Sequence, residues 1–228
     1  MVNATEDRIL TTRPNVSHRK RETFQFATTH VSVRIKRKLP SLRNPKARAK
    51  IVQALHEFKD RFQCRIVEFS ILSNHMHLIV EANNERELAK AMKGFLVRVA
   101  KALNKMWKRK GSVFADRYHV RIVKNSMSAV FKLRTLIRYV LQNARKHGIQ
   151  LPPDRPDPYS SGPWYRSWVG HQGETFSDEP CPVQDPRFME LQCARRGTLE
   201  LDERPSAYVP PGPTPGGKRK RRRMYTLR

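Results

Sequence analysis

A short polar turn, Ser73-Asn74, constrains the fold of this chain more than any other feature. It separates two mainly apolar segments, residues 65–72 and 75–81, each of strand length. Two such segments joined by a short turn predict an antiparallel hairpin. A hairpin at this point requires a sheet, and the helical patterns on both sides of it then predict a mixed α and β domain.

The second strand of this hairpin carries two histidines, His75 and His77. Side chains alternate between the faces of a strand, so both imidazoles are expected on one face, where they can bind one metal ion. Zinc is the default metal for imidazole and would need a third ligand. Mg²⁺ or Mn²⁺ prefers oxygen, which Asn143 or Gln142 and a substrate phosphate could supply.

The remaining elements follow from hydrophobic periodicity and from helix caps. We expect a strand at 23–35, a helix starting at Asn44-Pro45, a helix capped by Asn84, an edge strand within 113–123, and a helix from about 128 to 147 that ends before Gly148. The first six elements form a ferredoxin-like split β-α-β-β-α-β unit, an α+β fold with an antiparallel sheet and an added C-terminal helix. Helices would cover one face of this sheet and leave the other free for nucleic acid.

The last predicted helix places a tyrosine, Tyr139, opposite its apolar side. The arc that should face the core contains Val130, Leu133, Ile137, Val140, Leu141 and Ala144. Tyr139 shares the other side with Lys132, Thr135, Asn143 and Lys146, and is flanked by Arg138 and Gln142. Tyr139 is therefore either a partly exposed surface residue or a nucleophile.

The chain has 228 residues and a formal net charge of +26. This charge predicts a polyanionic partner, nucleic acid first and an anionic membrane surface second. With the histidine pair and Tyr139, it suggests cutting of a DNA strand through a covalent phosphotyrosine. No apolar run reaches the length of about 18 residues that spans a membrane. Three separated cysteines without a CxxC pair indicate a reducing cytoplasm, so we expect a cytoplasmic, nucleoid-associated protein.

Changes in composition divide the chain into four parts. Residues 1–22 are expected to form a flexible basic arm, and residues 23–148 the folded domain. Residues 149–204 are rich in proline and aromatic residues and should pack on the domain as an extension. Residues 205–228 end in the basic run 218–223 and are expected to be a disordered basic tail.

Several motifs in order resemble one family. His75-Met76-His77 is similar to the His-hydrophobic-His signature of the HUH endonucleases. The wider pattern resembles the single-tyrosine transposases, especially the REP-associated tyrosine transposases of bacteria. The matching stretches are residues 30–34, 39–43, 73–80, 113–119, 138–145 and 158–161, within about 24–168.

The resemblance implies a single-stranded DNA endonuclease and strand transferase, with residues 23–148 as its HUH nuclease and transposase domain. His75 and His77 would bind Mg²⁺ or Mn²⁺, with Asn143 completing the site and Gln142 as the alternative. Tyr139 would form a 5′-phosphotyrosine on hairpin-forming repeat DNA and leave a free 3′-OH. The protein would act as a monomer or a homodimer.

Basic residues around these motifs are candidates for binding DNA. They are Arg34, Arg37, Lys38, Arg117, Arg121, Arg138 and Lys146. A solvated charged edge is the alternative for the first three. Tyr118 either packs on the sheet, stacks on a base or is a second candidate nucleophile. The rival function is a non-catalytic ferredoxin-like module that binds single-stranded nucleic acid, or a domesticated transposase that binds without cutting.

Overall fold

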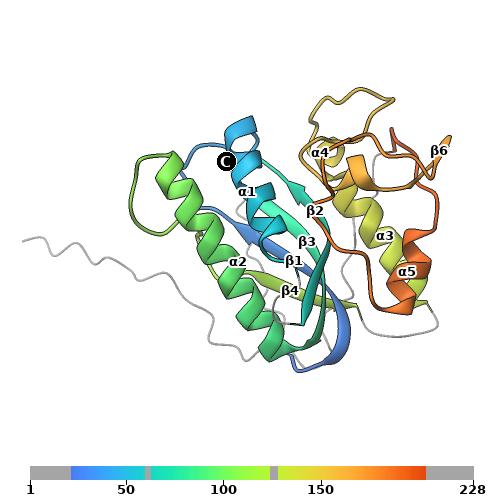
Figure 1. The fold of residues 1–228 in the computed structure, drawn as a ribbon, viewed down its shortest axis with the longest axis horizontal. Coiled ribbons are helices and arrows are strands. Elements are labelled where there is room, and N and C mark those ends of the chain that lie inside the picture. Colours follow the sequence, from blue (N-terminus) through green and yellow to red (C-terminus); the bar gives the residue numbers. More distant parts are fainter. Residues whose placement is uncertain (1–21, 60–62, 124–127, 204–228) are drawn as a thin grey trace, which may run out of the picture.

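A four-stranded antiparallel sheet forms the centre of the protein (Figure 1). The structure, a computed structural model, describes residues 22–59, 63–123 and 128–203. The strand order is β2 (Cys64–Ile71), β3 (His75–Asn84), β1 (Gln25–Arg34), β4 (His119–Val123). This is the order of the predicted ferredoxin-like split unit, so the α+β fold is confirmed. The predicted tail, 205–228, and residues 1–21 of the predicted arm lie outside the described residues.

The predicted hairpin is formed by β2 and β3. Ile71 pairs with Met76 across the turn, and the Leu72 amide donates to the His75 carbonyl at 2.8 Å. A register irregularity between Ile66 and Glu68 interrupts the ladder. Strand β3 lies between β2 and β1, so the histidines stand near the middle of the sheet rather than at its edge.

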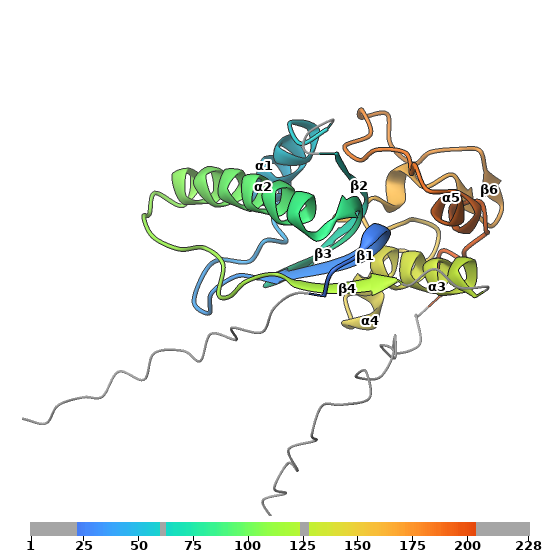
Figure 2. The same ribbon diagram turned by 90° about the horizontal axis from the view of Figure 1, so that it is seen from below.

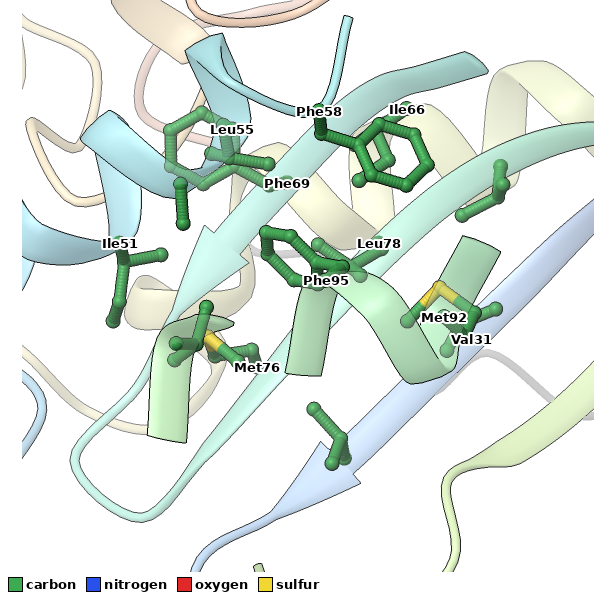
Figure 3. Packing of buried hydrophobic residues seen from close by; sticks show 14 of the residues in the cluster. Val31, Ile51, Leu55, Phe58, Ile66, Phe69, Met76, Leu78, Met92 and Phe95 are labelled. Carbon is green, nitrogen blue, oxygen red and sulfur yellow. The ribbon is translucent and has the colours of Figure 1, made fainter. Parts of the chain in front are cut away.

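Two helices cover one face of the sheet, as Figure 2 shows. Helix α1 (Pro45–His56) is capped by the Asn44 side chain, which accepts from the Ala47 amide. Helix α2 (Glu85–Met106) is capped in the same way by Asn84. The cluster beneath them is almost entirely apolar (Figure 3), and its labelled members are Val31, Ile51, Leu55, Phe58, Ile66, Phe69, Met76, Leu78, Met92 and Phe95.

The opposite face of the sheet is not free, and our expectation of an open face was wrong. Helix α3 (Ala129–Leu141) packs there, burying Val67 and Ile79 beneath Leu136 and Ile137. The strands supply apolar side chains to both faces, because β2 and β3 are buried along almost all of their length. Such strands need a cover on both sides.

The final helix is also shorter than predicted. It divides at Gln142 into α3 and a single turn, α4 (Asn143–Lys146). At this junction Gln142 has a φ of −99° and a ψ of 13°, and its side chain donates to the carbonyls of Glu200 and Leu201. The predicted stop at Gly148 is correct, since Gly148 has a φ of +74° and its amide donates to the Arg145 carbonyl.

Residues 149–203 continue around the second face. They contain a 3-10 turn, η1 (Gly162–Trp164), the short strands β5 (Ser167–Trp168) and β6 (His171–Gln172), and helix α5 (Met189–Arg195). Figure 1 shows α3 and α5 side by side. Tyr165 and Trp168 are buried in the cluster under α3, where their rings meet edge to face with centroids 5.2 Å apart.

Three buried carboxylates connect the sheet region to this segment. The first is Glu68 on β2, which has no exposed surface. One of its oxygens accepts from Arg195 of α5 at 2.7 Å, and the other accepts from the Ser161 hydroxyl at 2.5 Å. A buried carboxylate needs such partners to offset its desolvation.

The other two carboxylates are bound just as specifically. Glu81 of β3 accepts from the backbone amides of Arg187 and Phe188, at the start of α5. Asp157 receives two hydrogen bonds from the Arg43 guanidinium at 2.8 and 2.9 Å. The segment is therefore held to the sheet and to the loop before α1 by directional contacts.

None of the described helices combines the length and apolarity needed to cross a membrane.

Candidate active site

The two histidines of β3 lie together on the α3 side of the sheet, with ring centroids 4.9 Å apart. His77 is buried, with 6% of its surface exposed, and His75 is half-buried at the start of the strand. The Nδ1 atom of His75 lies 2.7 Å from the Asn74 Oδ1, so it donates to that oxygen. The Nδ1 atom of His77 lies 2.9 Å from the Nε2 atom of His30 on β1.

This cluster favours neutral imidazoles. Burial, with the repulsion of His147 and Arg34, lowers the pKa of His75 to about 4. Burial and the neighbouring histidines lower the pKa of His77 to about 2. Burial and Arg121 lower the pKa of His30 to about 4. All three rings are therefore neutral at physiological pH, which is the state that can donate a lone pair to a metal ion.

Helix α3 brings Tyr139 onto this cluster. The Tyr139 ring meets His77 and His30 edge to face, with centroids 5.5 and 5.8 Å apart. The Lys146 ammonium lies 4.4 Å from the ring centroid. Burial raises the pKa of the Tyr139 hydroxyl, while the Arg121 charge and the Asn143 side chain act to lower it. The side of the helix that the sequence predicted to be polar thus faces the histidines.

Several polar atoms at this point are buried without a well-formed hydrogen bond. They are the Nε2 atom of His77, both polar atoms of the Asn143 side chain, and the hydroxyl of Ser70, which pairs with His77 across the sheet. Buried polar atoms are normally satisfied, so a group of such atoms is a candidate place for a bound ion or ordered water. Among the described residues no three His, Cys, Asp or Glu side chains are grouped to hold a metal, so an amide would complete the set.

The two amides that could fill this position differ in what they contact. The Gln142 amide nitrogen already donates to two carbonyls, at 2.6 and 3.0 Å. Asn143 is fully buried, although the helical pattern placed it on the polar side, and it lies one turn beyond Tyr139. The structure therefore brings Asn143, and not Gln142, to Tyr139 with its oxygen available.

The predicted DNA-binding residues fall into two groups. Arg34 and Arg121 lie on strands next to the histidines, Arg34 opposite His75 and Arg121 opposite His30, and Lys146 covers Tyr139. Of the others, Arg37, Lys38 and Arg117 are exposed in loops, and Arg138 is paired with Glu203 at 2.5 Å. Tyr118, the second candidate nucleophile, packs against the cluster on the α1 and α2 side.

Sequence reasoning missed three members of this site. The sequence places His30 on a strand near the site but assigns it no role, and it singles out neither Ser70 nor His147. The His147 ring lies 5.4 Å from that of His75. The alternation of β1 could have placed His30 on the histidine side, but its diagonal approach to His77 depends on the strand register.

Comparison with known proteins agrees with this geometry. The family model described as "Transposase IS200 like" matches residues 23–143, which include β1 to β4, both histidines, Tyr139 and Asn143. This chain belongs to the IS200-like transposase family. Membership implies transposase and endonuclease activity on single-stranded DNA. No curated protein sequence matches this IS200-like transposase.

Two solved structures are similar to this IS200-like transposase. One, described as a REP-associated tyrosine transposase bound to a REP hairpin, is 16% identical, has a TM-score of 0.51, and covers 75% of this chain and 99% of its own. The other is described as a candidate transposase from Deinococcus radiodurans, with 13% identity, a TM-score of 0.37, and coverage of 52% and 94%. The first establishes a shared fold.

Proposed function

We propose that this transposase cuts and rejoins single-stranded DNA through Tyr139, which forms a 5′-phosphotyrosine. The observation that carries the proposal is the contact of the Tyr139 ring with the buried His77, where several polar atoms are left open. A tyrosine on an outer surface would have no such neighbours. Residues 23–148 would form the catalytic domain, and residues 149–204 an extension that supports α3.

The chemistry assigned to Tyr139 is a phosphoryl transfer. Its hydroxyl oxygen attacks the phosphorus and loses its proton, the bond from phosphorus to the 3′-oxygen breaks, and that oxygen leaves as a 3′-hydroxyl. Burial opposes ionisation of the phenol, and the positive charge of Arg121 favours it. One phosphoester bond replaces another in this step, so the bond energy is retained. Attack by another 3′-hydroxyl then rejoins strands without an external energy source.

The residues present fit a divalent metal ion. His75 and His77 would bind it through Nε2, because the Nδ1 atom of each is occupied, and the Asn143 Oδ1 would complete the protein ligands. The bound ion, Mg²⁺ or Mn²⁺, would polarise the scissile phosphate and stabilise the charge that develops on it. Gln142 is a weaker candidate, since its amide nitrogen donates to the carbonyls of Glu200 and Leu201, which fixes its side chain toward that segment.

The substrate proposed is a DNA hairpin with a single-stranded flank. Arg34 and Arg121 stand beside the histidines, where a phosphate at the site could be held by both. Arg37, Lys38 and Arg117 would extend this basic surface along exposed loops. The similar structure, which is bound to a REP hairpin, supports this substrate class for the present chain.

A covalent-trapping assay tests the proposal. Single strands from palindromic repeats flanking the gene, labelled at the 3′ end, are incubated with the protein and Mn²⁺ and run on a denaturing gel. The 3′-labelled fragment should stay on the protein, and a 5′-labelled copy should give a short free fragment. Tyr139→Phe and His77→Ala should abolish the adduct, whereas Tyr118→Phe, the matched control, should retain it.

Two outcomes would overturn this assignment. An adduct that survives Tyr139→Phe and disappears in Tyr118→Phe would move the nucleophile to the other side of the sheet. Tight binding without an adduct, on every flanking repeat and with either metal, would favour the non-catalytic binding module or a domesticated transposase.

A further inference from the structure

His30 is a histidine of the site that the proposed chemistry does not use. It lies on β1, buried with 6% of its surface exposed, and its strand partner on β3 is Ile79. Its ring therefore approaches His77 diagonally, nearly parallel, with an interplanar angle of 27° and centroids 5.0 Å apart. The two rings share a contact of 2.9 Å between the Nε2 atom of His30 and the Nδ1 atom of His77.

This contact decides which nitrogen of His77 can face a ligand. A neutral imidazole has one N–H and one lone pair. If the Nδ1–H of His77 donates to His30, the lone pair is on the Nε2 atom, the buried atom that has no hydrogen-bond partner. If His30 donates instead, His77 would bury an N–H on Nε2 and could not bind a metal through it. Only the first arrangement leaves a lone pair on the buried Nε2 atom of His77 for a metal ion.

His75 shows the same arrangement with a different partner. Its Nδ1 lies 2.7 Å from the Asn74 Oδ1, an acceptor, which leaves Nε2 for a ligand. Metal-bound histidines commonly donate their second N–H to an acceptor that fixes the tautomer and the ring orientation. For His75 this acceptor is an amide oxygen on the turn, and for the buried His77 it is another histidine.

We propose that His30 is a positioning residue: it accepts the Nδ1–H of His77 and so directs the Nε2 atom of His77 toward the metal ion. The inference rests on the proposed function for its metal site. His30 also contacts the Tyr139 ring edge to face, with centroids 5.8 Å apart. One side chain therefore sets both the orientation of a ligand and the position of the nucleophile's ring.

Binding of Co²⁺ to the full chain, followed by its visible absorption in the absence of DNA, tests the proposal. His30→Leu removes the acceptor and should weaken Co²⁺ binding by roughly 10- to 100-fold, as loss of such partners does. His30→Gln keeps an acceptor oxygen and should bind within roughly threefold of the unchanged protein, because the orienting hydrogen bond is retained. His171→Leu, a matched control on β6 outside the site, should have no effect.

The same variants are then compared in the trapping assay. The metal concentration that gives half-maximal adduct should rise in His30→Leu, and the rate should recover in part when Mn²⁺ is saturating. A residue that only fills space would change thermal stability without shifting the metal dependence. If His30→Leu does not fold, His30→Met, of similar reach and without a strong acceptor, takes its place in the comparison with His30→Gln.

Three results would overturn the inference. The first is that His30→Leu binds Co²⁺ as tightly as the unchanged protein. The second is that His30→Leu and His30→Gln lose Co²⁺ affinity equally. The third is that the unchanged protein does not bind Co²⁺. Equal losses would indicate that His30 is itself a ligand. The two proposals fail separately: Co²⁺ binding that depends on His30, without any DNA adduct, would refute the proposed function and leave the positioning role intact.

Discussion

The two faces of the sheet are built in different ways. Between the sheet and helices α1 and α2, the cluster consists of apolar side chains with almost no polar members. On the α3 side, apolar packing is mixed with buried polar and charged side chains: Thr28, His30, Glu68, Ser70, His77, Glu81, Gln142, Asn143 and Ser161. The same strands supply both faces, so the difference comes from alternate residues of the sequence.

One face mainly stabilises the fold, and the other fixes the positions of particular elements. Apolar packing is non-directional and depends on volume, so the first face stabilises the sheet without fixing any one side chain. The second face uses hydrogen bonds to Glu68 and Glu81, which fix where α5 and the segment around it lie. Helix α3 packs against both α5 and the sheet, and it carries Tyr139.

Phe95→Ala tests the apolar face and should have the largest effect on stability. Phe95 is completely buried and packs edge to face on Phe58, with centroids 5.9 Å apart. Its loss should lower the free energy of unfolding by about 3–5 kcal/mol, measured by urea denaturation. Co²⁺ affinity should be unchanged under folding conditions. A loss of affinity without a loss of stability would show that the two faces are not independent.

Arg195→Met tests the polar face. It leaves the Glu68 carboxylate buried beside Ser161 without its cation, which should lower the free energy of unfolding by about 3 kcal/mol. The double variant Arg195→Met with Glu68→Leu removes the orphaned charge and should recover most of this loss. Urea denaturation of the two variants decides the point, and a double variant no more stable than the single one would contradict it.

Acid should destabilise the protein through the buried histidines of the polar face. The pKa of His30 is lowered to about 4, and an unfolded histidine titrates near 6.5, so between these values the unfolded state binds a proton that the folded state does not. The free energy of unfolding should fall by about 2 kcal/mol for such a histidine between pH 7 and pH 5.

Urea denaturation at both pH values, with EDTA present, measures this loss. His30→Gln should reduce the pH dependence, while His171→Gln should leave it unchanged. Equal slopes in the unchanged protein and His30→Gln would refute the assignment to His30.

The contrast also explains what the sequence could predict. The hairpin, both cap residues Asn44 and Asn84, and the stop at Gly148 follow local rules, because a turn, a cap or a strand depends on neighbouring residues. The apolar residues that α1, α2 and the strands contribute to the first face can be predicted from hydrophobic periodicity alone. The resemblance to the family predicted that His75 and Tyr139 belong to one site, and the structure places both beside His77.

Other features of the site depend on contacts between distant parts of the chain. The Gln142 side chain is bound by carbonyls about sixty residues later, and Asn143 is buried where α3 packs over the sheet. The contact of His30 with His77 joins residues 47 positions apart and depends on the register of β1 and β3. Helical and strand periodicity contain no information about such pairings.

Lys146→Met should have the smallest effect, and it concerns the nucleophile itself. Methionine retains the helix and the aliphatic cover of the Tyr139 ring but removes the ammonium 4.4 Å from its centroid. A positive charge near the phenol favours the developing phenolate over the neutral hydroxyl, and its loss should cost the transition state about 1 kcal/mol, so the initial rate of adduct formation should fall by roughly fivefold. The effect should shrink as salt screens the charge.

Lys90→Met on α2, on the opposite side of the sheet, is the matched control and should leave the rate unchanged. Thermal unfolding should not distinguish Lys146→Met from the unchanged protein, because the Lys146 side chain is exposed. Equal rates for Lys146→Met and the unchanged protein at low salt would show that the cation over the ring does not assist its ionisation. Arg121 would then be the cation that favours the phenolate, because its charge acts to lower the pKa of Tyr139 against the effect of burial.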